Sequence, residues 1–296
     1  MFFWDLETVN KIVTKMQLSG ASDEHIKKTK SRLIRISEDL CYRCNLNDII
    51  IYINKLKREF APATYRKYVL DLKRILKEIR APFVEDLKLP NVPKRSKIVI
   101  RPQHLRKLIE QAKKLSESKY FRLRSAILLC STSGLRSVEL YKLKLDDIDI
   151  ENRTIYVRAE IAKDYEDRVT FFSKEAQEAL QGYIPMAKST PFVKDTLVKD
   201  FRKLNVKSGR IVLRMKHMRK FFSQQSDRLG MPTAAKKILM GHSLHGDVDL
   251  QHYDFQDEEE LKQIYDRYWR DFKILDQAHS LKAISGGEDE HFKIEE

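Results

Sequence analysis

Cysteine is scarce in this sequence, which has three in 296 residues, an odd number. That count excludes a disulfide framework and favours a reducing cytosol. Apolar runs such as "IIIYI" (49–53) and "AILLC" (126–130) fall well short of the roughly 18 residues that a membrane span needs. The start, "MFFWDLETVN", has early acidic residues and no basic segment, so we expect no signal peptide. These absences predict a cytoplasmic protein with no membrane partner.

Positive charge is abundant but unevenly distributed. The chain has 57 Lys and Arg against 43 Asp and Glu, a net charge of +14. Residues 254–296 hold six basic and thirteen acidic residues, a net of −7, which leaves +21 on residues 1–253. A basic protein can be merely well solvated, but this imbalance favours a nucleic-acid partner.

The first 88 residues have the periodicity of helices. In "TYRKYVLDLKRILKEI" the apolar residues recur every three or four positions. Thr64, after a proline, is the predicted N-cap. The basic residues Arg66, Lys67, Lys73 and Arg74 fall on the opposite side of this helix. They make either an ordinary solvated face or, given the overall charge, a face that contacts phosphate groups.

Residues 90–99 predict a linker, because they include two prolines, no helical period and the basic residues Lys94 and Arg95. A helical domain, 1–89, precedes it. In residues 100–255 helical stretches surround "DIDIENRTIYVRAEIAKDYEDRVTFFS", which alternates around two polar turns, as antiparallel hairpins do. We expect a mainly α fold with a small antiparallel β-sheet.

Three histidines lie close together in "LMGHSLHGDVDLQHYDF" and raise the possibility of a metal site. His242, His245 and His252 lack the tight spacing and the fourth ligand of structural zinc sites. The C-x-x-C pair "CYRC" lies far upstream, in a stretch we expect to be helical. We therefore predict no metal here.

The segment "TSGLRSVEL" is more informative. A small-residue turn delivers Arg136 at a helix start, and Glu139 lies one turn later, able to reach back. A surface ion pair of this spacing is common. The apolar neighbours indicate partial burial instead, and an arginine held by a carboxylate is a rigid fork for phosphate.

Five further polar residues follow in order along the chain. Lys163 lies on the predicted hairpin turn, Lys216 and Arg219 lie in "KHMRKFF", His242 follows a glycine, and Tyr253 comes eleven residues later. Taken alone, each of these residues is equally consistent with an ordinary solvated side chain on the surface.

Together, G-L-R-x-x-E, a hairpin lysine, x-x-x-R, G-H and a tyrosine resemble the tyrosine recombinase (phage integrase) family over roughly residues 100–255. "APATYRKYVLDLKRIL" resembles that family's helical core-binding domain. The family's usual H-x-x-R is K-x-x-R here, with His217 one residue out of register. This form is similar to the fusellovirus-type integrases of archaea, found on viruses or plasmids.

The resemblance implies a metal-free and ATP-free reaction. Arg136 and Arg219 would bind the phosphate, with Glu139 orienting Arg136. Tyr253, whose ordinary pKa is near 10, would form a covalent 3′-phosphotyrosine, with Tyr265 and Tyr268 as rival nucleophiles. Lys163 would protonate the leaving 5′-hydroxyl, and His242 and Lys216 would assist. Four protomers would act on two sites in double-stranded DNA, through a Holliday junction.

Residues 256–296 form an acidic C-terminal helix and tail. The amphipathic stretch 257–275 either packs on its own catalytic domain or docks on a neighbouring protomer, and the pattern favours neither. Three other functions stay open: a type IB topoisomerase, which would not bring two sites together; a relative that only binds DNA; and a metal-dependent nuclease, which EDTA would inactivate.

Overall fold

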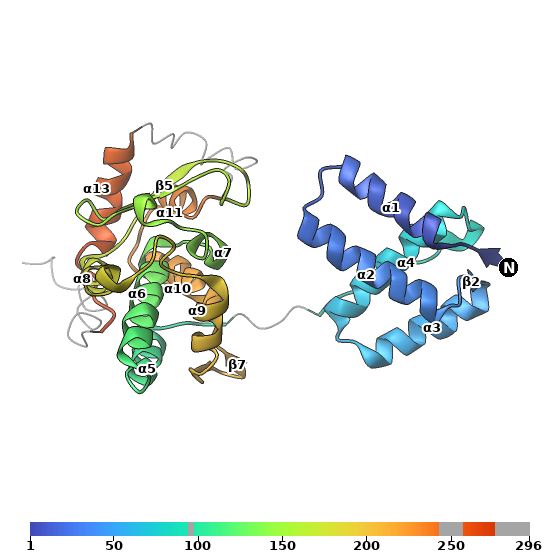
Figure 1. Cartoon of the computed structure of the whole chain (residues 1–296), viewed down its shortest axis with the longest axis horizontal. Helices are drawn as coiled ribbons and strands as arrows, with labels where there is room; N and C mark the ends of the chain where they lie inside the picture. The colour runs from blue at the N-terminus through green and yellow to red at the C-terminus, as the bar shows by residue number, and fades with distance from the viewer. Residues whose placement is uncertain (94–97, 243–256, 276–296) are drawn as a thin grey trace, which may run out of the picture. The chain divides into compact units, whose positions relative to one another are not determined.

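A computed structural model describes residues 1–93, 98–242 and 257–275, and divides the chain into two units, Met1–Ser96 and Lys97–Glu296. The division falls within residues 90–99, where the sequence predicts a linker. Figure 1 shows helices in both units and the largest sheet in the second. In the described part of the chain, no helix is long and apolar enough to cross a membrane.

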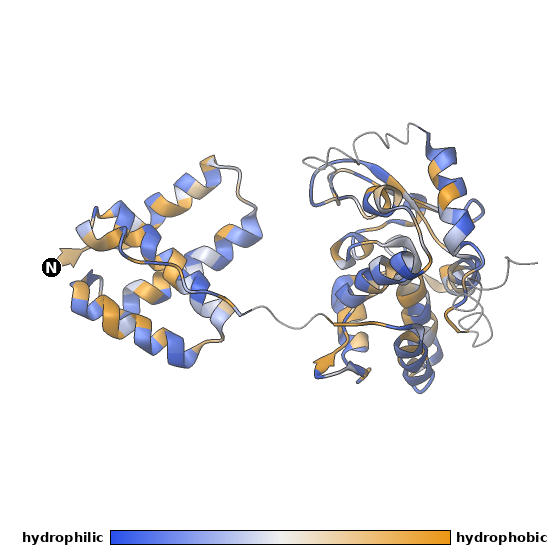
Figure 2. Ribbon diagram, turned by 180° about the vertical axis from the view of Figure 1, so that it is seen from behind, coloured by the Kyte–Doolittle hydropathy of each residue, from blue (hydrophilic) through white to orange (hydrophobic). Residues whose placement is uncertain are grey.

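Unit 1 is a helical bundle with one very short strand pair. It contains β1 (Phe2–Phe3), α1 (Leu6–Leu18), α2 (Asp23–Asp39), β2 (Arg43–Cys44), α3 (Leu46–Glu59), α4 (Pro62–Glu78) and η1 (Pro82–Val84). Each helix carries apolar residues on one side and polar residues on the other, as the two colours of single helices show in Figure 2. Their apolar sides make a core of their own, separate from that of unit 2.

The helix α4 begins earlier than the sequence predicted. Its N-cap is Ala61 and Pro62 is its first residue, so the prediction of Thr64 as N-cap is wrong. Proline suits the first helical position because its fixed φ is already helical and no N–H is lost there. The "CYRC" stretch also differs from expectation, because Cys41 and Tyr42 have positive φ and form a turn after α2.

Unit 2 is larger and contains the three-stranded sheet. Its elements begin with α5 (Pro102–Ala112), α6 (Glu117–Ser133), α7 (Ser137–Leu140), η2 (Leu145–Asp147), β3 (Ile148–Asp149), β4 (Thr154–Val157), β5 (Arg168–Phe171), α8 (Lys174–Tyr183) and η3 (Ile184–Met186). They continue with α9 (Lys194–Phe201), β6 (Lys207–Ser208), β7 (Ile211–Val212), α10 (Lys216–Arg228), α11 (Thr233–Leu239) and α13 (Glu258–Trp269). The strands β3, β4 and β5 are antiparallel neighbours in that order. The mainly α fold with a small antiparallel sheet is therefore confirmed.

The helix α6 lies in the core of unit 2, and its second half is buried on all sides. The polar side chains of its last turns are hydroxyl groups that donate to carbonyls of the same helix. Thr132 donates to Leu128 O and Ser133 to Leu129 O. Gly134 ends the helix with φ +70°, and a Cβ there would lie 2.6 Å from Phe222 Cδ1. The chain can therefore turn sharply toward α7 only with glycine at this position.

The helix α13 packs within its own unit. Trp269 is fully buried and stacks on Phe222 with ring centroids 5.0 Å apart, and Asp266 accepts two bonds from Arg153 at 2.6 and 2.7 Å. This is the first of the two arrangements considered for residues 257–275. Docking on a neighbouring protomer is not tested by a single chain and stays a prediction for residues 256–296, of which 256 and 276–296 lie outside the described residues.

Candidate active site

The turn between α6 and α7 presents Arg136 to the site. Arg136 precedes the short helix α7, and Glu139 reaches back to it, as predicted. One oxygen of Glu139 accepts from the Arg136 backbone N–H and the other from Nη1, both at 2.8 Å. Glu139 is fully buried, whereas the Arg136 side chain keeps 18% of its surface exposed. The pair is therefore an orienting contact inside the unit that leaves part of the Arg136 side chain exposed.

A second arginine, Arg168 at the start of β5, shares the same carboxylate. Its Nη2 and Nη1 lie 2.6 and 3.2 Å from the two oxygens of Glu139. Burial is the largest influence on the Glu139 pKa and raises it, but the bonds and charges of Arg168 and Arg136 together outweigh it. The net pKa of Glu139 is lowered, so the group is ionised at neutral pH. Sequence reasoning missed Arg168, because its partner lies 29 positions away.

Arg219 of α10 contacts both the end of α6 and His242. Its Nη1 donates to the carbonyl of Gly134 at 2.7 Å, and its Nη2 lies 2.9 Å from His242 Nε2. Burial above all, and then the nearby charge of Arg136, lower the pKa of Arg219 to about 10. Arg219 therefore carries its charge at neutral pH but lies among other positive charges. A bound anion would reduce the repulsion between them.

His242 follows α11 and Gly241, as the sequence suggested. Gly241 has φ +60°, its carbonyl accepts from Arg136 Nη2 at 2.6 Å, and the backbone N–H of His242 donates to Lys237 O at 2.9 Å. Burial, followed by the charges of Arg219 and Arg136, lowers the pKa of His242 below its usual 6.5. The imidazole is neutral at pH 7, so its Nε2 can accept from Arg219.

The first turn of α10 separates the roles of Lys216 and His217. Lys216 is exposed. His217 is half-buried, and its Nδ1 accepts the backbone N–H of Arg214 at 2.9 Å. His217 is therefore bonded to the loop that precedes its own helix, and Lys216 is the residue of this pair whose side chain is exposed.

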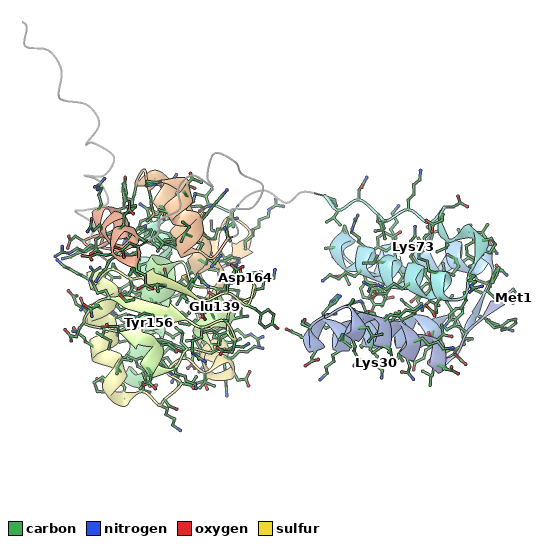
Figure 3. The ribbon with its side chains drawn as sticks, turned by 90° about the horizontal axis from the view of Figure 1, so that it is seen from above. Met1, Lys30, Lys73, Glu139, Tyr156 and Asp164 are labelled. Atoms are coloured by element: carbon green, nitrogen blue, oxygen red, sulfur yellow. The ribbon has the colours of Figure 1, made fainter. Side chains whose placement is uncertain are left out.

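The connection between β4 and β5 borders the site. Lys163 is exposed on it, and its neighbour Asp164 lies 3.4 Å from Arg136 Nη2. Figure 3 labels Asp164 and Glu139, the two carboxylates that Arg136 joins, and Tyr156 on the neighbouring strand β4. The hairpin thus carries Lys163 within one residue of a side chain that contacts Arg136.

Tyr253, His245 and His252 lie outside the described residues. Of the rival tyrosines, Tyr265 is fully buried and its hydroxyl donates to Thr132 O at 2.9 Å. Burial raises its pKa well above the usual value of 10. Tyr265 is therefore a core residue, inaccessible as a nucleophile. Tyr268 is half-buried against the same core.

No group of three or more possible metal ligands occurs among the residues that the structure places. Cys41 is exposed and Cys44 is buried.

The basic face predicted on α4 divides into two halves. Arg66 and Lys67 are exposed, although Arg66 donates to Pro90 O at 2.6 Å. Lys73, labelled in Figure 3, and Arg74 are half-buried and bonded within unit 1, to Leu87 O at 3.2 Å and Asp71 Oδ1 at 2.5 Å. Thr64 is exposed in the first turn. Lys94 and Arg95 of the linker lie outside the described residues.

Three arginines and the buried carboxylate of Glu139 therefore meet near His242 in unit 2, with the carboxylate of Asp164 3.4 Å from Arg136 Nη2. The two carboxylates face three positive charges, and the Arg136 side chain is twice as exposed as that of Arg168. Forked N–H donors of partly buried arginines are suited to the oxygens of a phosphate group.

Comparisons with known proteins identify relatives of this chain. Residues 99–259 match the phage integrase family. The tyrosine recombinase XerA of Saccharolobus solfataricus is 30% identical over 192 residues, which are 63% of this chain and 62% of that protein. The chain thus spans less than two thirds of that curated relative.

Two solved structures share the fold. A lambda integrase dimer bound to a COC′ core site has a TM-score of 0.65 at 15% identity, covering 80% of this chain and 94% of that one. The Tn1549 transposon integrase in complex with a circular intermediate DNA has a TM-score of 0.58 at 17% identity, covering 90% and 99%.

Proposed function

The chain belongs to the phage integrase family, and on that premise we propose that it is a site-specific DNA recombinase that cuts and rejoins DNA through a covalent 3′-phosphotyrosine, with neither metal nor ATP. One observation carries the proposal. Arg136 and Arg219, 83 positions apart in the sequence, converge on the turn before His242 through bonds to Gly241 O and to the imidazole.

The two arginines bind the non-bridging oxygens of the phosphodiester to be cut. Charge builds on these oxygens as the attacking group approaches phosphorus, and fixed donors stabilise it without reorganising. Glu139 holds Arg136 in place, as its two bonds to that residue indicate. The arginines thereby do the work that metal ions do in other phosphoryl-transfer sites.

Tyr253 supplies the nucleophile. Its phenolic oxygen bonds to phosphorus, the bond from phosphorus to the 5′-oxygen breaks, and the phenolic proton passes to a neighbouring base. Lys163 gives a proton to the departing 5′-oxygen, because the hairpin that carries it borders Arg136. The ammonium group of Lys216 contacts the phosphate, and the neutral imidazole of His242 contacts the phosphate or receives the tyrosine proton. Since the phosphotyrosine conserves the bond energy, religation is the reverse reaction.

Double-stranded DNA with a specific attachment or crossover site is the proposed substrate. Unit 1 contacts the backbone through Arg66 and Lys67, aided by Thr64, Lys73, Arg74 and the linker residues Lys94 and Arg95. The fold neighbours include a lambda integrase tetramer bound to a Holliday junction (TM-score 0.64, 16% identity). We propose a homotetramer on two DNA sites for this chain, working on DNA in the cytoplasm for an archaeal mobile element.

A trapping experiment tests this function. The DNA site is first selected from random duplexes by binding, then nicked so that cleavage is irreversible, and incubated with protein in EDTA. We expect a protein–DNA adduct on a denaturing gel for the wild type and for Tyr268→Phe, and none for Tyr253→Phe. An adduct that survives Tyr253→Phe would overturn the choice of nucleophile. Cutting only after Mg²⁺ or Zn²⁺ is added would overturn the mechanism.

A further inference from the structure

Arg168 has the contacts of a residue that acts through its neighbours. Its side chain is 9% exposed, half the exposure of Arg136. All three guanidinium nitrogens face groups of the protein. Nη1 and Nη2 donate to the carboxylate of Glu139, and Nε lies 3.4 Å from Leu239 O. Little of this cation is left for an incoming phosphate.

Through Glu139, Arg168 fixes the position of Arg136. Each oxygen of this fully buried carboxylate accepts one bond from each arginine, so the plane of the carboxylate is set from two sides. Without Arg168, Arg136 would be the remaining ion-pair partner of Glu139 among the described residues, and the carboxylate would be held from one side.

Arg168 also supports the turn that carries His242. A Cβ on Gly241 would lie 2.9 Å from both Cδ and Nε of Arg168, so the arginine packs directly against the backbone of that residue. The carbonyl of the same glycine accepts from Arg136 Nη2 at 2.6 Å. One side chain thus contacts both the orienting carboxylate and the turn before the histidine.

We propose that Arg168 is a positioning residue, which holds Arg136 through Glu139 and the turn 239–241 by direct packing, so that Arg136 and His242 are in place before the phosphate arrives. This inference rests on the proposed recombinase function. It assigns Arg168 a role in the rate of cleavage and almost none in DNA affinity.

The test compares Arg168→Gln and Arg168→Lys with a matched control, Arg153→Gln. Arg153 is an equally buried arginine of the same unit, and its guanidinium bonds to Asp266 and to Phe172 O instead of to a proposed catalytic group. For Arg168→Gln we expect the rate of adduct formation at saturating DNA to fall on the order of 10- to 100-fold, the range seen for groups that orient a metal ligand. DNA affinity should change by less than about twofold.

Arg168→Lys should recover part of the rate, because it keeps the charge and loses the paired bonds. It also carries the test if Arg168→Gln does not fold. Arg153→Gln should lower the unfolding temperature and leave the rate unchanged. A double-mutant cycle with Glu139→Gln should be strongly non-additive, since both changes break the same contact.

Several outcomes would overturn the inference. These are an unchanged rate in Arg168→Gln, a DNA affinity that falls as much as the rate, effects that simply add with Glu139→Gln, or an equal rate loss in Arg153→Gln. If the wild type itself forms no adduct, the proposed function fails instead. That result is recognised before any variant is compared.

Discussion

Replacing Trp269 by alanine tests whether α13 belongs to the core of its own unit. Trp269 is fully buried, stacks on Phe222, meets Phe221 and Phe272 edge-on with ring centroids 6.3 and 5.1 Å away, and donates from Nε1 to Ser226 Oγ at 3.0 Å. A helix that only rested against this unit while waiting for another molecule would bury much less.

The expected loss is large. Truncation of a buried tryptophan to alanine costs about 3–5 kcal/mol, from lost burial and the cavity left behind. Unit 2 spans Lys97–Glu296. For domains of that size each kcal/mol lowers the unfolding temperature by roughly 2–4 °C, so we expect a fall of about 6–20 °C.

Calorimetry of the full chain measures this effect. Because the two units have separate cores, the transition of unit 1 should stay where it is while that of unit 2 moves. Tyr268→Ala, a half-buried neighbour on the same helix, serves as the control and should produce a clearly smaller shift. The wild-type transition should not depend on protein concentration, since the contact is intramolecular.

A shift below about 2 °C, well under the range expected for a cavity of this kind, would refute the reasoning. So would a wild-type transition that rises with protein concentration and ceases to do so in Trp269→Ala. That second pattern would mean that α13 is held by a neighbouring molecule.

Three other predictions follow from the site. Arg136→Ala should abolish adduct formation and leave most DNA binding, measured by gel and by filter retention, because the basic surface supplies affinity; normal cutting would contradict the assignment. Affinity should fall steeply with salt, with a log–log slope of about −0.9 for each phosphate contact, and a flat response between about 50 and 200 mM would contradict it. Because burial and the charges of Arg219, Arg136 and Arg168 lower the pKa of His242, the imidazole is neutral at pH 7. The cleavage rate should fall as acidification below pH 6.5 protonates it, and His242→Gln should lack this acid-side decline.

Local patterns were readable from the sequence. The alternation that predicts β3, β4 and β5 arises because neighbouring residues of a strand point to opposite faces, which needs no knowledge of the rest of the fold. The same holds for Arg136 and Glu139, which are one helical turn apart. Long-range contacts were not readable, and Arg168 is the clearest case, since nothing near it in the sequence marks Glu139 as its partner.

The misplaced helix start has a different cause. Thr64 is a good N-cap by residue type, but Pro62 two positions earlier is even better suited to open a helix. Two local preferences competed, and residue ranking alone does not say which prevails. The position of α13 was undecided for another reason: an amphipathic helix shows that it has a partner without showing which surface that partner offers.

The two separate cores, joined by one short segment, have a consequence for binding strength. If both units bind the DNA that we propose as substrate, the covalent link keeps the second unit near a DNA molecule held by the first, at an effective concentration in the millimolar range for short linkers. Two weak binding contacts then act together as one tight one. A unit that dissociates can rebind before the other unit also leaves the DNA. Cutting the chain between the units would abolish this avidity while leaving each core folded.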